Sequence, residues 1–138
     1  MQRALFAVVV LVAVSARAAE KVLRDPDHIR IYELALRHFL AVRGAPPEAT
    51  VYVATGSAPA PAEVIERFRG SRPRVRAWEK DTSIPHRYYC GMMLGLATGR
   101  ECYLVVWGYV RPVLHHYHFK KHGSDWQLLS DEVAHLDG

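Results

Sequence analysis

The C-terminal third of the chain constrains the fold most, because three β-prone segments follow one another with only short interruptions. Residues 102–110 form the first segment, Arg111-Pro112 interrupts it, and residues 113–122 form the second. Gly123-Ser124-Asp125 indicates a turn, and Trp126–Leu129 is predicted to be the closing strand. Three strands joined by short turns predict an antiparallel meander.

A long amphipathic helix is predicted ahead of these strands. Asp25 is a suitable N-cap with Pro26 at the first helical position, and Gly44 followed by Pro46-Pro47 ends the helix. Between these signals, apolar side chains recur at steps typical of one helix face: Ile29, Tyr32, Leu36, Phe39 and Leu40. A stripe of this width normally faces a sheet. The predicted fold class is therefore α+β, with the long N-terminal helix packed on a curved antiparallel sheet that has a C-terminal three-stranded meander.

Shorter elements are predicted in the middle of the chain. Thr50–Ala54 is short and β-rich, Pro61 opens a second short helix that Gly70 closes, and Val75–Lys80 is predicted to be a strand. Residues 81–99 are expected to hold a partial strand and a loop, because three glycines break the apolar pattern: Gly91, Gly95 and Gly99.

The closing sequence Gly123-Ser124-Asp125-Trp126-Gln127-Leu128-Leu129, taken with the long helix and the late strands, resembles two kinds of protein. It is similar to the nuclear-transport-factor-like cone fold and its cystatin-like relatives, in which the final hairpin carries a Gly, a Trp and an apolar strand. It also looks like small exported bacterial proteins of uncharacterised family. The resemblance implies a curved sheet wrapped on a helix. It implies no catalytic residues, because these folds host enzymes, binding modules and dimerisation domains alike.

Residues 1–18 have the layout of a secretory signal peptide. Arg3 gives a positive start, residues 4–14 are eleven apolar residues in a row, and small residues follow up to Ala18. Eleven residues make a helix of ~17 Å, which is too short for a hydrocarbon core of ~30 Å and disfavours the alternative of an uncleaved anchor. We expect cleavage after Ala18, a single α+β domain over residues 19–138 without a transmembrane segment, and a periplasmic or secreted location.

The composition excludes several classes of protein. With 138 residues, half of them apolar, the chain is too short for a large barrel enzyme and too apolar for a disordered tail. Removal of the predicted leader takes away Arg3 and Arg17, so the formal charge of +4 overstates the basicity of the mature chain. Neither this charge nor export favours a nucleic-acid partner. No phosphate-binding glycine loop and no Cys-x-x-Cys pair is present, so no cofactor is expected.

Cys90 and Cys102 are the two cysteines of the chain, and we expect a disulfide between them because an exported protein meets oxidising conditions. The bond would close a loop of 13 residues. It would contribute on the order of 3 kcal/mol by the chain-entropy model. The alternative is two buried free thiols.

His116 and His118 are candidate metal ligands, because alternate residues of a strand share a face and a His-x-His pair offers two imidazoles to zinc or copper. A complete site needs at least one more ligand. The candidates for it are His38, His86, His135 and Asp131. The alternative is a solvated outer face, or hydrogen-bonded histidines beside the core.

Arg72, Arg74 and Arg76 are a candidate anion-binding group, because an extended strand would place all three on one face. Guanidinium groups suit carboxylates, phosphates and anionic glycans, so lipid headgroups, cell-wall polymers or an acidic partner are the ligands considered. The alternative is a charged strand edge that prevents strand-to-strand aggregation.

Tyr103, Trp107 and Tyr109 alternate onto one face of their strand, while the other face is apolar too. One face must cover the helix, and the second is a candidate interaction face or a homodimer interface. We therefore expect a non-catalytic binding or interaction module whose partner is an unknown protein or an anionic envelope ligand. The alternatives are a small cone-fold enzyme with a polar cavity that holds His115 or Asp131, and a His-x-His metal-binding protein.

Overall fold

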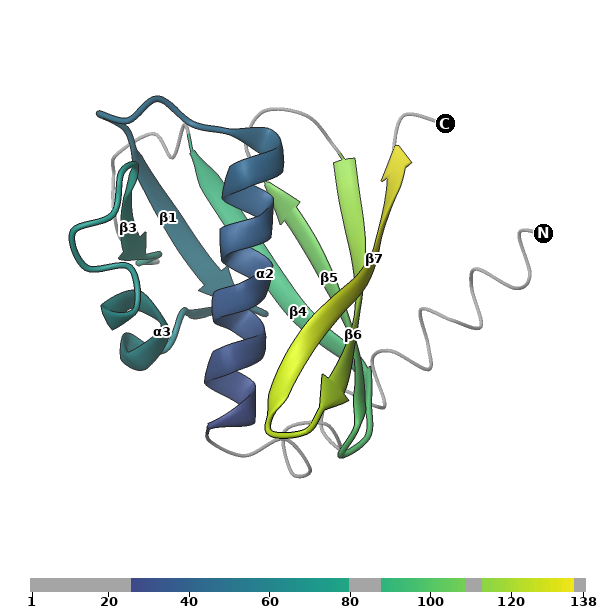
Figure 1. Ribbon diagram of the computed structural model, residues 1–138. Coiled ribbons are helices and arrows are strands. Elements are labelled where there is room, and N and C mark those ends of the chain that lie inside the picture. The colour runs from purple at the N-terminus through teal and green to yellow at the C-terminus, as the bar shows by residue number, and fades with distance from the viewer. Residues whose placement is uncertain (1–25, 80–87, 109–112, 136–138) are drawn as a thin grey trace.

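The protein is an α+β protein, and its described residues form one helix of 17 residues, one short helix and a seven-stranded mixed sheet (Figure 1). The computed structural model describes residues 26–79, 88–108 and 113–135. The predicted leader, Asp25, His86 and Tyr109 lie outside these ranges. Within the described residues, no helix has both the length and the apolar character needed to cross a membrane.

The helices are α2 (Asp27–Arg43) and α3 (Ala62–Glu66), and the strands are β1 (Thr50–Thr55), β2 (Ala58–Pro59), β3 (Arg74–Ala77), β4 (Tyr89–Ala97), β5 (Glu101–Gly108), β6 (Val113–His122) and β7 (Asp125–His135). The strand order is β2-β1-β4-β5-β6-β7, and β3 pairs with β1.

The prediction of a wholly antiparallel sheet was wrong, because β1 runs parallel to both β3 and β4. Parallel neighbours need a crossover connection, and the segment that carries α3 provides it between β1 and β3. From β4 to β7 each strand pairs antiparallel with the next, so the C-terminal meander has four strands, one more than predicted.

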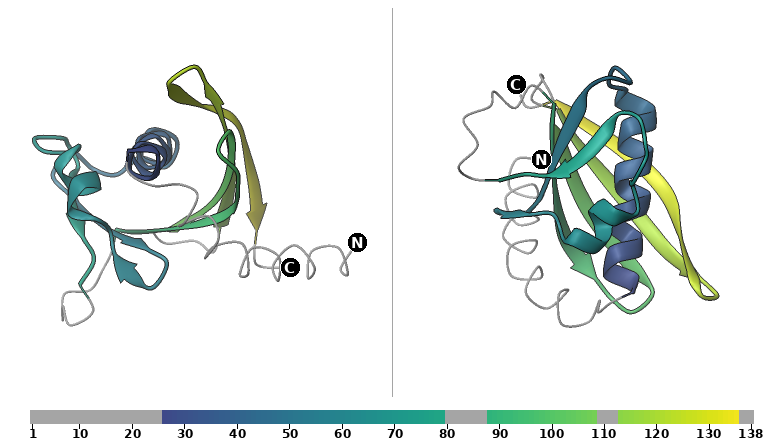
Figure 2. Two further views of the ribbon diagram at one scale, coloured as in Figure 1. Left: turned by 90° about the horizontal axis from the view of Figure 1, so that it is seen from below. Right: turned by 90° about the vertical axis from the view of Figure 1, so that its left-hand side faces the viewer.

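Four of the five residues in the predicted apolar stripe of α2 are buried and Leu40 is half-buried, and two apolar residues that the prediction left out are buried as well. Ile31 and Ala35 are fully buried, as are Leu36 and Phe39 to within 1%. These side chains belong to one hydrophobic cluster with residues of β1, β4, β5 and β6. Figure 2 shows α2 along one face of the sheet. The helix ends at Gly44, whose φ of 68° is unfavourable for other residues and whose N–H donates to the Leu40 carbonyl at 2.9 Å.

The period-two pattern of β5 and β6 is confirmed. Leu104 and Val106 are at most 1% exposed on the inner face, the face toward α2, whereas Tyr103 is 44% exposed on the opposite, outer face. On β6, Tyr117 and Phe119 are buried and Lys120 is exposed. Both strands therefore contribute side chains of one face to the core.

The segment 81–99 was predicted to hold a partial strand and a loop, and its described part holds one strand, β4, from Tyr89 to Ala97, whose register with β5 shifts between Leu94 and Ala97. Residues 81–87 lie outside the described ranges. Gly91 does not interrupt the strand, since it lies opposite Trp107 of β5 and a Cβ at this position would overlap the indole ring. The tryptophan thus occupies the space that a side chain on residue 91 would fill. This close approach explains a glycine inside a strand.

The predicted disulfide is wrong, because the strands hold the two thiols far apart. Cys90 lies opposite Gly108, and Cys102 lies opposite Ala97. Gly108 and Cys102 are six residues apart on β5. At ~3.3 Å per residue this separates the sulfurs' strand positions by ~20 Å, whereas a disulfide needs Cα atoms within ~7 Å. Both cysteines are free and buried, and burial raises the pKa of the Cys102 thiol to about 12.

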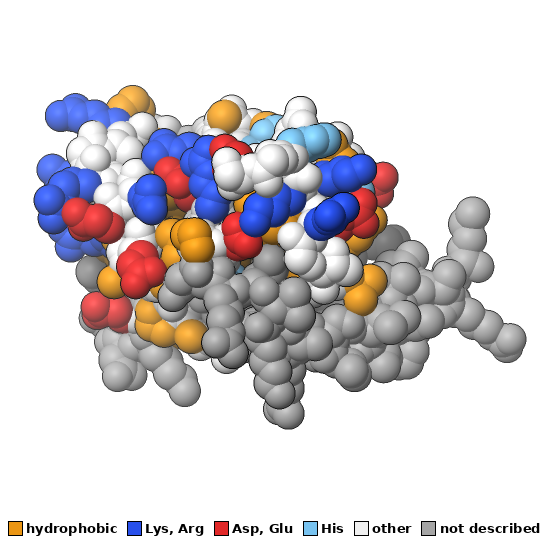
Figure 3. All heavy atoms as spheres, turned by 60° about the horizontal axis from the view of Figure 1, so that its bottom comes forward, with side chains coloured by type: hydrophobic (Ala, Val, Ile, Leu, Met, Phe, Trp, Pro, Cys, Tyr) orange, Lys and Arg blue, Asp and Glu red, His pale blue; other side chains and the backbone are white. Residues whose placement is uncertain are grey.

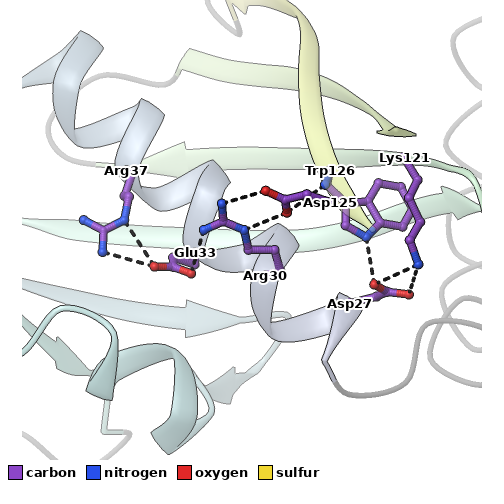
Figure 4. Close-up of polar contacts among 7 residues, drawn as sticks. All are labelled: Asp27, Arg30, Glu33, Arg37, Lys121, Asp125 and Trp126. Atoms are coloured by element: carbon purple, nitrogen blue, oxygen red, sulfur yellow. Dashed lines mark hydrogen bonds and ion pairs between the residues drawn. The ribbon is translucent and has the colours of Figure 1, made fainter. Parts of the chain in front are cut away.

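A chain of polar contacts attaches the β6–β7 hairpin to the first turns of α2 (Figure 4). Asp27 accepts hydrogen bonds from the indole Nε1 of Trp126 at 3.0 Å and from Lys121 Nζ at 3.2 Å. Arg30 binds both carboxylate oxygens of Asp125, at 2.9 and 3.0 Å. Residues in and beside the predicted turn thus attach the hairpin to the start of the helix.

Candidate functional site

Four arginines line an open pocket of about 670 Å³ between α3, β3 and the loop that follows α2. They are Arg69, Arg72, Arg74 and Arg76, and the same pocket is lined by Glu48 and Glu66. In Figure 3, lysine and arginine side chains gather at the left-hand end of the molecule, where α3 and β3 lie in Figure 1. The three arginines predicted as an anion-binding group therefore do lie together.

The local sequence explains how these side chains reach the pocket. On β3, Arg74 and Arg76 are exposed while Val75, between them, is 8% exposed and joins the core. Arg72 precedes the strand and is exposed. Arg69 follows the end of α3, where Gly70, with a φ of 75°, reverses the chain toward β3.

The charge on three of these arginines is not neutralised by neighbours. Among residues 26–79, 88–108 and 113–135, no carboxylate lies within ion-pair distance of Arg72, Arg74 or Arg76, whereas Arg69 pairs with Glu66 at 3.0 Å. The pocket is therefore a concentration of positive charge. As β3 pairs in the described sheet with β1 alone, Arg74 and Arg76 also lie on an edge strand, where charge opposes aggregation.

A second polar group lies between α2 and the inner face of β6 and β7, around the carboxylate of Asp131. Its Oδ1 is 2.8 Å from His115 Nδ1, and its Oδ2 is 3.0 Å from His38 Nε2. The His115 side chain is 1% exposed and that of His38 is 33% exposed. We call His38, Arg43, His115 and Asp131 the histidine network.

Arg43 fixes the tautomer of His115. Its Nε donates a hydrogen bond to His115 Nε2 at 2.8 Å. Because arginine can only donate, His115 Nε2 must accept, so the proton of this neutral imidazole is on Nδ1 and is donated to Asp131. The lone pair that a general base would use is therefore occupied by Arg43.

Asp131 reaches the inner face through a β-bulge in β7. Phe119 pairs with Leu128, but the next residue of β6, His118, pairs with Ser130, so Leu129 is the extra residue. Beyond the bulge, Asp131 lies opposite Tyr117 on the core side. Without it, the same hairpin would place Asp131 opposite His116 on the outer face.

Tyr117 carries an unpaired polar atom beside the histidine network. Its ring meets His38 edge to face at a centroid distance of 5.2 Å. The residue is fully buried, and within the described parts of the chain its hydroxyl has no hydrogen-bond partner. Burial raises the pKa of this phenol above its usual range.

His116 and His118 lie on the opposite, outer face of β6 from His115, as the alternation predicted. His118 stacks on Tyr103 at 4.3 Å, and its Nε2 is 3.8 Å from a Glu101 carboxylate oxygen. Asp131 faces inward and cannot be their third ligand. No group of three or more metal-ligating side chains suited to a metal ion occurs among the described residues, which exclude His86 and the side chain of His135. The metal site stays a prediction.

The candidate interaction face is partly open. Tyr103 is 44% exposed and Trp107 is half-buried, while Tyr109 falls outside the described ranges. Leu96, at the end of β4, is 41% exposed. Its role as an interface stays a prediction.

Sequence reasoning missed Arg43 as a member of the histidine network and did not assign Arg69 to the anion-binding group. The alternation of the strand predicted Tyr117 on the same face as His115, but nothing in the sequence indicates the hydrogen bond from Arg43. No family model matches this chain, and no curated protein or solved structure matches it either. Its function is therefore inferred from the chemistry of the site.

Proposed function

We propose that this protein is an exported, non-catalytic binding module that takes an anionic ligand in the pocket between α3 and β3. The observation that carries the proposal is the meeting of Arg72, Arg74 and Arg76 at one pocket without a carboxylate partner among the described residues. Guanidinium groups match carboxylates and phosphates in geometry and charge. Like charges held together repel, so a bound anion would stabilise the arrangement.

The contribution of α3 supports binding over the simpler role of a charged edge. An edge needs charge only on the edge strand. Here Arg69 enters the same pocket from the end of α3, and Ser71 and Glu48 line it as well. Residues from several segments thus surround one space, which is the usual form of a ligand site.

The proposal extends to the fold and the location. We infer that the sheet curves around α2 as in cone-like folds, and that residues 1–18 direct the chain out of the cytoplasm. A mature protein that begins at Ala19, measured by mass spectrometry after expression with the full sequence, would support export. Recovery of the intact chain from the cytosol would contradict it.

Salt-dependent retention on an anionic resin tests the binding site. The triple variant Arg72→Ala/Arg74→Ala/Arg76→Ala should elute at lower salt than the wild type. The matched control is Arg67→Ala/Arg100→Ala/Lys120→Ala, which removes the same charge from exposed side chains outside the pocket. If both triple variants elute together, net charge alone explains retention and the proposal fails.

A small enzyme is the second candidate function, and the histidine network is the observation that favours it. Asp131 holds the partly exposed His38 at 3.0 Å in the manner of a carboxylate behind a general base, whereas His115 cannot take that role because Arg43 occupies its lone pair. Ligand-observed NMR with a fragment set can test this candidate. Fragments that bind the wild type and the arginine triple variant, but not Asp131→Asn, would support it, and binding unaffected by Asp131→Asn would exclude it.

A further inference from the structure

We infer that the pocket between α3 and β3 takes a linear polyanion, a chain with several phosphate or carboxylate groups in a row, instead of a single small anion. This inference rests on the proposed function and names the ligand class of the same site.

The spacing of the arginines is the first argument. Arg74 and Arg76 are successive residues on one face of β3, so their Cα atoms are ~6.6 Å apart, and Arg72 lies at a bend just before the strand. One carboxylate or phosphate is commonly held by a bidentate guanidinium contact. Drawing every guanidinium to a single anion would bring their like charges together. A chain that carries several anionic groups can bind each guanidinium group at its own position, without bringing the arginines together.

The pairing of Arg69 is the second argument. Glu66 neutralises it at 3.0 Å, so the uncompensated charge is confined to Arg72, Arg74 and Arg76. Among the described residues that line the pocket, the arginines without an ion-pair partner are therefore spread along the segment from Arg72 to Arg76 and are not gathered at one point. A chain laid along this segment would meet three positive groups in succession.

The volume of the pocket is the third argument. Its volume of about 670 Å³ is far larger than one small anion needs. For scale, a water molecule takes up about 30 Å³ in the liquid. The space suits several monomer units of a polymer.

The residues that line the pocket also favour a soluble polymer over a membrane surface as the ligand. A protein face that binds a bilayer usually inserts exposed apolar side chains among the headgroups. Here Phe68 and Val75 are 4% and 8% exposed, and Ile65 is half-buried. A hollow lined by buried apolar groups and exposed arginines fits a soluble chain better than a flat bilayer.

Isothermal titration with two series of oligomers tests the inference. The probes are linear oligophosphates and oligogalacturonates of one, two, four and eight units, titrated into the wild type at low salt. We expect affinity to rise at least about tenfold from one unit to four, because later contacts become intramolecular. The series that binds more tightly identifies the source of the anionic groups.

The dependence of the binding constant on salt concentration measures how many ion pairs the oligomer forms with the protein. For the eight-unit oligomer, each of the single variants Arg72→Ala, Arg74→Ala and Arg76→Ala should reduce the slope of log K against log salt by about one. Arg67→Ala, outside the pocket, should leave the slope unchanged.

The outcomes separate the two proposals. If no oligomer binds in either series, the proposed function fails. If the single unit binds as tightly as the eight-unit oligomer, the polyanion inference is overturned and the proposed function stands. Tighter binding to vesicles of anionic lipid than to any oligomer also overturns it, in favour of a membrane surface.

Discussion

Two histidines contact the carboxylate of Asp131 at almost the same distance, yet their coupling free energies with Asp131 should differ several-fold. His115 Nδ1 is 2.8 Å from Asp131 and His38 Nε2 is 3.0 Å from it. The His115 side chain is 1% exposed, and that of His38 is 33% exposed. The perturbation is alanine substitution of each residue alone and of each histidine together with Asp131.

The expected magnitudes follow from burial. A buried hydrogen bond to a charged group is worth about 1.5–3 kcal/mol, and a buried donor left without a partner adds its desolvation cost. We therefore expect a coupling free energy of about 2 kcal/mol for His115 and Asp131. His38 can turn to water when Asp131 is removed, so its hydrogen bond should contribute a net free energy near the low end of the usual range, about 0.5–1 kcal/mol. Its coupling to Asp131 should fall in that lower range.

Urea denaturation of each variant gives the free energies of unfolding for two double-mutant cycles. The cavity left by His115→Ala is common to the single and double variants, so it cancels in the coupling term. Measurement at pH 8 keeps ordinary imidazoles neutral. Equal coupling energies for the two pairs, or a larger value for His38, would refute the argument that burial decides the strength of these bonds.

Three further predictions concern single groups. Neither Cys90 nor Cys102 should react with a thiol reagent in the native, unreduced protein, since burial raises the pKa of both thiols, and both should react after unfolding; absence of free thiol then would contradict the structure. Tyr117→Phe should raise the free energy of unfolding by about 1 kcal/mol, because it removes a buried hydroxyl without a partner; a loss of stability would show that the hydroxyl is bonded. Arg30 holds the pKa of Asp125 down to about 2, so this ion pair stabilises the fold above about pH 4 and is lost as the pH falls through 2. Asp125→Asn should therefore cost less than about 1 kcal/mol at pH 7 and clearly less at pH 2, where the carboxylate is half protonated, and an equal cost at both pH values would refute the assignment.

Local patterns predicted much of the fold because their causes are local. The apolar stripe of α2, the alternation of β6 and the turn at Gly123 each depend on residues near one another in the chain, and the structure confirms all three. The direction of β1 relative to β4 depends on how the crossover segment returns, and no pattern within either strand indicates it.

The errors came from contacts between distant residues. Gly91 was expected to break a strand, but its environment is set by Trp107 across the sheet. The Cys90–Cys102 bond was predicted from redox compartment, which says nothing of the register that separates the two residues. Both predictions failed because the sequence does not reveal which residues of neighbouring strands lie opposite each other.

The candidate sites also combine features with local causes, which the sequence predicted, and features set by distant contacts, which it did not. Exposure of Arg74 and Arg76 follows from period-two alternation, whereas the entry of Arg69 into their pocket depends on where α3 ends. The inward direction of Asp131 depends on one extra residue, Leu129, and direct counting from the turn would place the carboxylate on the outer face. A single bulge thus decides whether Asp131 meets His115 or His116.

The arginine pocket and the histidine network share no residue, but α2 contacts the elements of both. Arg37 of α2 donates to the Arg67 carbonyl at the end of α3 at 3.0 Å, and nearly two turns further along the helix Arg43 binds His115. Free-energy changes at sites without shared partners usually add. The stability losses of Asp131→Ala and of the arginine triple variant should therefore sum within about 0.5 kcal/mol in urea denaturation of the combined variant. A larger discrepancy would show that α2 transmits strain between the two sites, and then loss of polyanion affinity in Asp131→Ala would follow from a shift of the helix and not from a direct contact.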